Sequence, residues 1–215
     1  ILVDGANLSS YFINVSRGGT ANVEMINHAA VDFIEAGNSG AQTHTHIVVD
    51  ASTLNGATKG RHYDIDKAPT AKDYLAGNAI YLDSADSGNA DIDIQNNSLV
   101  KGRIFAGGAD EHDITVQDSR IQTGGILLSM TKNNNAITVQ NSVIDSTGNY
   151  AKSANAIDIT NIAAMQNKTQ AIVVDRSQLT GSVMLASSGS TNTLSVTGSS
   201  ITKTTQKDGN AISMS

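Results

Sequence analysis

The chain has no cysteine and no tryptophan, a single proline, and only 4% aromatic residues. Without cysteine these residues form no disulfide, no thiolate metal site and no cysteine nucleophile. The scarcity of aromatic rings argues against a carbohydrate-processing enzyme, because sugar rings are commonly bound on aromatic side chains. No apolar run is long enough to span a bilayer. Lys and Arg are scattered and the net charge is −6, which argues against nucleic-acid and anionic-membrane binding.

One short pattern recurs eight times: apolar, any, apolar, polar, turn residue, small polar, any, apolar. Most successive copies begin about 22 to 24 residues apart, a period typical of solenoids. In such chains function is expected on a long lateral surface and in loops that interrupt the repeat. The copies are Ile1–Leu8, Val23–Ala30, Ile47–Leu54, Ile92–Leu99, Ile114–Ile121, Ile137–Ile144, Ile172–Leu179 and Leu194–Ile201.

Each copy predicts a strand, a corner and a second short strand. The first and third positions are apolar and mostly β-branched, and a spacing of two puts them on one face of a strand. The fifth position is Gly, Asn or Asp in six of the eight copies, and these residues tolerate a left-handed backbone. The last position is expected to point inward again, with residues Leu8, Ala30, Leu54, Leu99, Ile121, Ile144, Leu179 and Ile201.

A third apolar run precedes each copy after the first. With three short strands per period, we predict an all-β fold, a right-handed parallel β-helix with about 22 to 24 residues per coil. A β-sandwich would instead show Asn-Gly or Asp-Gly hairpin turns at irregular spacing, whereas the corner here keeps one offset. The third runs are residues 12–15, 32–34, 79–82, 103–105, 125–128, 156–159 and 183–185.

Residues 1–215 are expected to form one domain, truncated mid-coil at both ends, because neither end carries a polar capping repeat. The interval from Ile47 to Ile92 is about double the period, and residues 55–77 are predicted to form an inserted loop at one corner. This loop is either the binding site or a neutral surface insertion. Its candidate ligand-binding residues are Lys59, Arg61, His62, Tyr63, Asp64, Asp66, Lys67, Lys72 and Tyr74.

Two other sets of side chains have the spacing of reactive groups. The carboxylates of Asp91 and Asp93 stand two residues apart and so share one strand face, as in some glycan-cleaving sites, but an exposed outer face is the ordinary place for Asp. His44 and His46 could begin a zinc site, which needs three or four ligands, and no third ligand is evident. We therefore predict no catalytic residue, no metal site and no cofactor.

The repeats resemble the passenger domain of a bacterial type V autotransporter adhesin, of the pertactin-like or self-associating type. The resemblance rests on units such as Asn78-Ala79-Ile80-Tyr81-Leu82 and Ala136-Ile137-Thr138-Val139-Gln140-Asn141-Ser142-Val143-Ile144, on corners rich in Ser, Thr, Asn and Gly, and on the absence of cysteine. It implies a β-helix displayed at the bacterial cell surface and tethered by an outer-membrane barrel that these residues do not contain.

The resemblance implies adhesion, aggregation and biofilm formation without enzymatic activity. The expected partner is a host-surface or extracellular-matrix ligand, another passenger on a neighbouring cell, or both, with no nucleic acid and no membrane insertion by these residues. Two alternatives stay open. One is a β-helical polysaccharide-degrading enzyme or a phage tailspike-like glycan-binding protein, and the other is a structural spacer.

Overall fold

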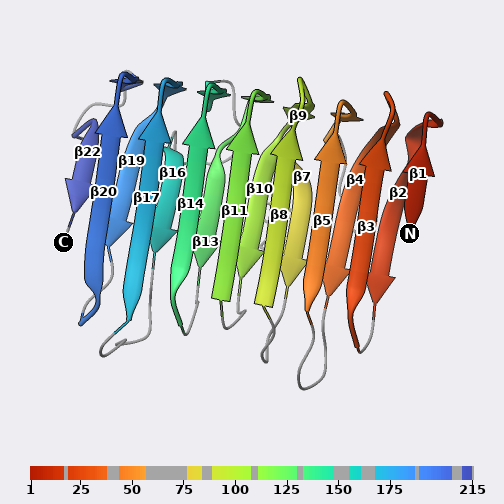
Figure 1. The fold of residues 1–215 in the computed structure, drawn as a ribbon, viewed down its shortest axis with the longest axis horizontal. Coiled ribbons are helices and arrows are strands. Elements are labelled where there is room, and N and C mark those ends of the chain that lie inside the picture. Colours follow the sequence, from red (N-terminus) through yellow and green to blue (C-terminus); the bar gives the residue numbers. More distant parts are fainter. Residues whose placement is uncertain are drawn as a thin grey trace, which may run out of the picture.

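The chain folds into β-strands, and its described part contains no helix. Neighbouring strands in both sheets are parallel, and the two termini lie at opposite ends of the molecule (Figure 1). These features confirm an all-β fold of parallel strands and are consistent with a parallel β-solenoid. The computed structural model describes residues 1–16, 19–37, 44–56, 77–83, 89–107, 111–129, 133–147, 155–160, 168–186, 189–204 and 210–214.

Eight strands, one from each copy of the pattern, form the first sheet. Their side chains alternate between buried and accessible positions, as in β14, because successive residues of a strand point to opposite faces. The order along the sheet is β1 (Leu2–Asp4), β3 (Ala21–Ile26), β5 (Thr45–Asp50), β8 (Asn89–Gln95), β11 (Glu111–Gln117), β14 (Asn135–Gln140), β17 (Thr169–Asp175) and β20 (Thr191–Thr197).

The second sheet contains fourteen strands in two rows. Strand β4 (Ala30–Gly37) joins the rows because it pairs with both β6 and β7, and it also pairs with β2 (Asn7–Ser16). One row contains β6 (Thr53–Leu54), β9 (Leu99–Lys101), β12 (Arg120–Gln122), β15 (Val143–Asp145), β18 (Gln178–Thr180) and β21 (Ser200–Thr202). The other contains β7 (Asn78–Asp83), β10 (Arg103–Gly107), β13 (Ile126–Ser129), β16 (Asn155–Thr160), β19 (Ser182–Ala186) and β22 (Ile212–Met214), and its first five strands lie on predicted third runs.

The register stacks equivalent positions of the repeats. Ile114 is paired with Ile92 on one side and with Ile137 on the other, and Ile172 is paired with Leu194. These side chains belong to one apolar core that runs the length of the molecule between the sheets. Because a one-residue slip would turn every apolar side chain outward, this core fixes the register of the strands.

The doubled interval in the sequence does not add a strand to the first sheet. Ile47 of β5 is paired directly with Ile92 of β8, so both residues occupy neighbouring positions of the same stack. The extra residues therefore connect β6 to β7, between the short strand and the third strand of one repeat.

Each corner after a strand of the first sheet uses a left-handed backbone. Six corners use one such residue, namely Gly5, Ala51, Asp118, Asn141, Arg176 and Gly198, with φ between 46° and 59°. Asn, Asp and Gly tolerate this conformation, whereas for Ala51 and Arg176 it costs about 1–2 kcal/mol.

Two corners contain an extra left-handed residue, which corrects two predicted core positions. Asn96 and Asn97 both have positive φ, as do Asn27 and His28. The extra residue reverses the in-and-out alternation that follows it. Val100 is therefore fully buried in place of the predicted Leu99, and Val31 is fully buried in place of Ala30.

Serines at the corners form a ladder of hydrogen bonds from repeat to repeat. Each backbone N–H donates to the Oγ of the serine in the next repeat, from Ser52 to Ser98, Ser119, Ser142, Ser177 and Ser199, over 2.9–3.2 Å. The ladder satisfies backbone donors that the corner would otherwise leave buried without a partner.

The two ends of the core are less covered than its middle. Leu2 in β1 is 61% exposed, and Val196 in the edge strand β20 is 41% exposed, whereas its neighbour in the stack, Val174, is fully buried. Among the described residues, no helix has the length and apolar character needed to cross a membrane.

Candidate functional site

The predicted ligand-binding residues lie outside the part of the chain that the structure describes, so that prediction remains open. They are Lys59, Arg61, His62, Tyr63, Asp64, Asp66, Lys67, Lys72 and Tyr74. The loop's described flanks, Gly56 and Gly77, both have a positive φ. A Cβ on Gly56 would meet the backbone carbonyl oxygen of Lys101 at 2.0 Å, so this flank of the loop requires glycine.

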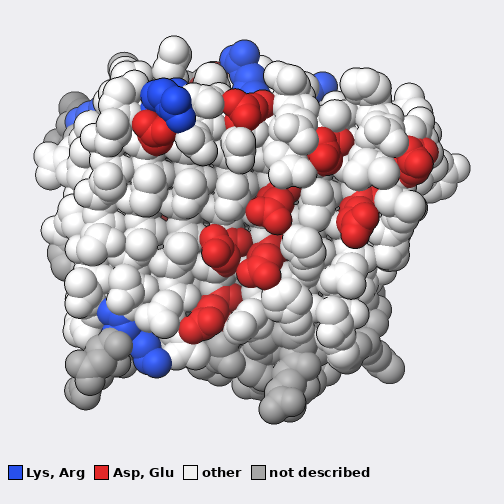
Figure 2. Space-filling model, in the orientation of Figure 1, with Lys and Arg blue, Asp and Glu red and all other residues white. Residues whose placement is uncertain are grey.

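The side chains of the first sheet that point away from the core form an accessible surface, which we call the outer face. Carboxylates collect near its centre: the register places Asp91 of β8 directly beside Asp113 of β11. We call Asp91, Asp93, Glu111 and Asp113 the acidic patch. Figure 2 shows a group of Asp and Glu over the middle of this face, with further ones along its upper edge and on the right, and Lys and Arg only toward its edges.

Two histidines lie beside the acidic patch: His46 in β5, and His44, which directly precedes this strand. The Nε2 atom of His44 is 3.1 Å from a carboxylate oxygen of Asp91, and that of His46 is 3.2 Å from a carboxylate oxygen of Asp93. These are pairwise contacts between half-exposed side chains. In the described ranges, no three His, Cys, Asp or Glu side chains are grouped so that they could hold a metal ion.

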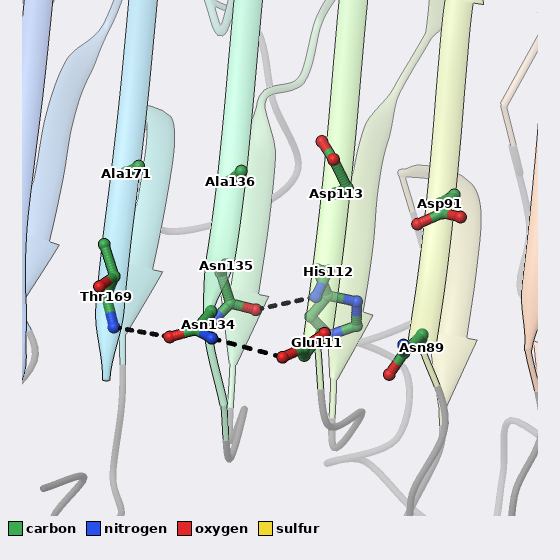
Figure 3. A pocket seen from close by; sticks show the side chains of 10 residues that line it. All are labelled: Asn89, Asp91, Glu111, His112, Asp113, Asn134, Asn135, Ala136, Thr169 and Ala171. Carbon is green, nitrogen blue, oxygen red and sulfur yellow. Dashed lines mark hydrogen bonds between the residues drawn. The ribbon is translucent and has the colours of Figure 1, made fainter. Parts of the chain in front are cut away.

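A hollow of about 300 Å³ adjoins the acidic patch on the outer face. Ala136 of β14 and Ala171 of β17, which are neighbours in the register, line it with short apolar side chains. Figure 3 shows the carboxylates of Asp91 and Asp113 on the neighbouring strands at the level of the two alanines. A small side chain at these two positions leaves space that longer residues would fill.

Polar groups border the lower end of the hollow. The side-chain amide of Asn134 donates to a carboxylate oxygen of Glu111 over 3.4 Å, and its Oδ1 accepts from the backbone N–H of Thr169 over 2.9 Å (Figure 3). These bonds link β11 and β17 through Asn134, the residue directly before β14. Asn134 is thereby held in one orientation, because its donor and its acceptor are both engaged.

Asp113 is the most perturbed carboxyl group of the hollow. Its partial burial raises its pKa, and the negative charges of Asp91 and Asp93 raise it further. No hydrogen bond or ion pair to its carboxylate occurs within the described residues. Three carboxylates thus lie close together, and two of them, Asp91 and Asp93, contact histidines.

His112 also lines the hollow, but its side chain is buried on the inner side of β11. Its backbone N–H donates to Asn135 Oδ1 over 3.1 Å, and Asn135 in turn donates to Gln170 Oε1 over 2.6 Å. Neither ring nitrogen has a hydrogen-bond partner among the described residues. Burial lowers the pKa of His112 to about 4, so the ring is neutral at pH 7 and gives the neighbouring carboxylates no counter-charge.

A second group of conspicuous side chains lies on the other sheet. The rings of Tyr81 and Phe105 are stacked with centroids 5.1 Å apart, and the guanidinium of Arg103 lies 5.6 Å from the centre of the Phe105 ring. Arg103 also donates to Asn78 Oδ1 over 2.7 Å. Both faces of β10 are buried, so these groups stabilise the packing of β7 and β10 and present no open site.

The strand pattern explains why the hollow is not evident from single motifs. The pair Asp91 and Asp93 is visible in the sequence, but Asp113 becomes its neighbour only through the register of β8 and β11. Asp91, Asp113 and Ala136 each stand one residue before the first apolar position of their copies. Aligning the copies on that position is the signal that brings them together.

The chain was compared with family models, curated proteins and solved structures. No family model matches it, and neither a curated protein nor a solved structure matches it. The function of the chain is therefore inferred from its own residues and their geometry.

Proposed function

We propose that the chain is a right-handed parallel β-helix with three short strands per coil and about 22 to 24 residues per coil. The register supports this proposal, because Ile92, Ile114 and Ile137 follow one another in one stack at intervals of one repeat. The order of strands supports it too: after each strand of the first sheet from β5 onward, the chain forms one strand of each row of the second sheet in turn. The right hand follows from the general preference of parallel crossovers.

We further propose that this rod belongs to the passenger domain of an autotransporter adhesin at the bacterial cell surface. The observation that carries the proposal is the outer face: eight parallel strands in register whose outward side chains are mainly short or polar. The row Thr115, Thr138, Val173 and Ser195 repeats one outward position along the rod that is polar in three of its four members. Such a surface offers many weak contacts in a regular array.

Adhesion through this face would depend on the number of contacts. A single hydrogen bond between two proteins contributes about 0.5–1.5 kcal/mol net, because it replaces bonds to water. Many rods side by side on two surfaces would supply a high effective concentration, so weak individual contacts suffice. The acidic net charge keeps the free rods soluble and apart until such contacts form.

The test couples the purified chain to beads and measures two quantities, bead clustering and retention on surfaces coated with extracellular-matrix proteins. Adhesion predicts clustering or retention that increases with the density of the chain on the bead. A variant lacking residues 57–75 separates the two adhesive regions, because activity of the outer face survives this deletion and activity of the inserted loop does not. Inert beads at every density would refute the adhesin proposal and favour a structural spacer.

One observation favours a second candidate, a polysaccharide-cleaving enzyme. Asp91 and Asp113 face a hollow together, and the raised pKa of Asp113 is a property of a general acid. Turnover of uronic-acid polymers and bacterial glycans tests it. Cleavage that disappears in Asp113→Asn would establish the enzyme, and absence of cleavage across these polymers would exclude it for them.

A further inference from the structure

The hollow on the outer face combines an apolar floor with a negatively charged side. Ala136 and Ala171 provide the floor, and the carboxylates of Asp91 and Asp113 stand on the adjacent strands in the same register row. A chain of methylene groups that lies over the two alanines would therefore bring its end to the carboxylates. Lysine and arginine have this construction, an apolar stem with a cationic head.

The charge of this region is not balanced from within. His44 and His46 contact Asp91 and Asp93, Asp113 has no ion-pair partner among the described residues, and His112 beneath it is neutral at pH 7. The closeness of like charges makes the patch more negative than its surroundings (Figure 2). A cation placed there would relieve this repulsion, which is the basis of electrostatic complementarity in interfaces.

We propose that the hollow with its acidic patch is a docking site for a basic segment of a partner protein, which inserts a lysine or arginine side chain. The stem packs on Ala136 and Ala171, the head contacts Asp91 and Asp113, and Asn134 and Thr169 border the lower end. A segment that crosses the strands in this row passes Ala171 and Ala136 and then reaches Asp113 and Asp91, at the strand spacing of about 4.8 Å.

The hollow fits this occupant better than the other cationic ligands. A metal ion needs several ligands around one point, and no group of three such side chains occurs in the described part of the chain. An amino-sugar polymer would be expected to use an aromatic platform, and the residues that line the hollow include no Phe, Tyr or Trp. A second copy aligned patch on patch would bring two acidic patches together in the hollow, and like charges in an interface are unfavourable.

This inference rests on the proposed function in one respect, that the outer face is the adhesive surface. Its experiment is therefore a binding measurement in solution, independent of bead adhesion. The full 215-residue chain is titrated into a fluorescent oligolysine of about eight residues, a length that reaches across several strands. Anisotropy is recorded at about 20 mM and about 150 mM salt, because an electrostatic contact at a surface weakens with screening.

Two pairs of variants locate the contact. Asp91→Asn with Asp113→Asn removes two charges from the hollow, and Asp4→Asn with Glu24→Gln removes two charges from the outer face at β1 and β3. We expect the first pair to weaken binding by about tenfold and the second by less than about twofold, as for a contact between specific charges.

A second comparison tests the shape of the hollow. Ala136→Leu fills it, whereas Thr138→Leu enlarges an outward side chain of the same strand that does not line it. We expect Ala136→Leu to weaken binding as much as the charge variants and Thr138→Leu to leave it unchanged. Both positions face outward, so neither change disturbs the core. A peptide of acetylated lysines is expected not to bind, because its side chains carry no charge.

Several results would overturn the proposal. They are absence of oligolysine binding at low salt, equal loss in the two charge pairs, unaltered binding in Ala136→Leu, and binding of the acetylated peptide. Displacement of the peptide by about 1 mM Ca²⁺ would identify a metal site instead, and tighter binding of a chitosan oligomer would identify a glycan site. If the beads adhere but oligolysine does not bind, only this inference is refuted. If oligolysine binds but the beads do not adhere, only the adhesin proposal is refuted.

Discussion

The backbone N–H of Ser142 donates to the Oγ of Ser177 over 3.0 Å, while the Oγ of Ser142 accepts from the backbone N–H of Ser119 over 3.1 Å. The hydroxyl of Ser142 also contacts the backbone carbonyl of Gln140 at 2.6 Å. Ser142 therefore links three successive repeats, through its side chain to the repeat of Ser119 and through its backbone N–H to the repeat of Ser177. The ladder that results ties the corners together along the molecule.

Replacing Ser142 with alanine is expected to lower the free energy of unfolding by about 1–3 kcal/mol, because it leaves the buried N–H of Ser119 without an acceptor. Urea unfolding followed by circular dichroism measures this loss. The control is Thr138→Ala on the accessible side of β14, where we expect a change within about 0.5 kcal/mol. Equal losses in the two variants would mean that the ladder contributes nothing specific.

The periodicity of the sequence predicts most of the fold. Apolar residues two apart locate the strands of the first sheet, and the recurring Gly, Asn and Asp locate the corners, because few other residues accept a left-handed backbone. The two corners with an extra residue were predicted wrongly, since Asn96 and Asn97 both adopt positive φ and the pattern assumed one such residue. The repeat pattern alone does not show how many left-handed residues a corner contains.

The site is less accessible to prediction than the fold. Asp91 and Asp113 are adjacent only because β8 and β11 pair in one register, and the pattern of a single repeat does not show this. The hollow exists because the side chains of Ala136 and Ala171 are short, and a short side chain does not form a recognisable sequence motif. Side chains that act together across repeats become visible when the repeats are aligned and stacked.

Replacing Val100 tests the corrected alternation after the corner at Asn96 and Asn97. Val100 is fully buried and pairs with Leu54, whereas the adjacent Leu99 is only partly buried. Val100→Ala is expected to lower the free energy of unfolding by about 2 kcal/mol, because it leaves a cavity in a packed core. Leu99→Ala removes more atoms but is expected to cost less. Thermal and urea unfolding of both variants measure the two losses. A larger loss in Leu99→Ala than in Val100→Ala would mean that the corner contains no extra residue.

The corner at Ala51 offers a stabilising substitution. Ala51 has φ of 46°, a conformation in which asparagine is favoured over alanine, and Asn141 occupies the equivalent corner with φ of 47°. Ala51→Asn is expected to raise the free energy of unfolding by about 1 kcal/mol, and Asn141→Ala is expected to lower it by a similar amount. Denaturant midpoints of the two variants measure both changes. A loss of stability in Ala51→Asn would contradict the assigned corner.

The buried ring of His112 predicts a dependence of stability on pH. Its pKa is about 4 in the folded chain, because burial disfavours the charged ring, and 6.5 is the ordinary value expected when the chain unfolds. As pH falls through 6.5 the unfolded chain binds a proton that the folded chain does not bind. The contribution of His112 is thus fully present above pH 6.5 and declines until pH 4, by about 3 kcal/mol in total.

This decline is expected to disappear in His112→Gln. A glutamine at this position carries no titratable group and extends the amide row formed by Asn135 and Gln170, which are the buried neighbours on β14 and β17. The facing residue of β8 is Ala90, and the carboxyls of Glu111 and Asp113 lie on the outer side of β11. The raised pKa of Asp113 acts in the opposite direction, because the folded chain then binds its proton more readily than the unfolded chain.

Urea unfolding between pH 4 and pH 7 measures the slope for the native chain, for His112→Gln and for His46→Gln. His46→Gln is the control, since it removes a half-exposed histidine from the outer face and leaves the buried ring in place. The native chain and His46→Gln are expected to lose stability in parallel toward pH 4, whereas His112→Gln keeps a flatter profile. A steep profile in His112→Gln would assign the acid sensitivity to the carboxyl groups, which bind protons in the same pH range.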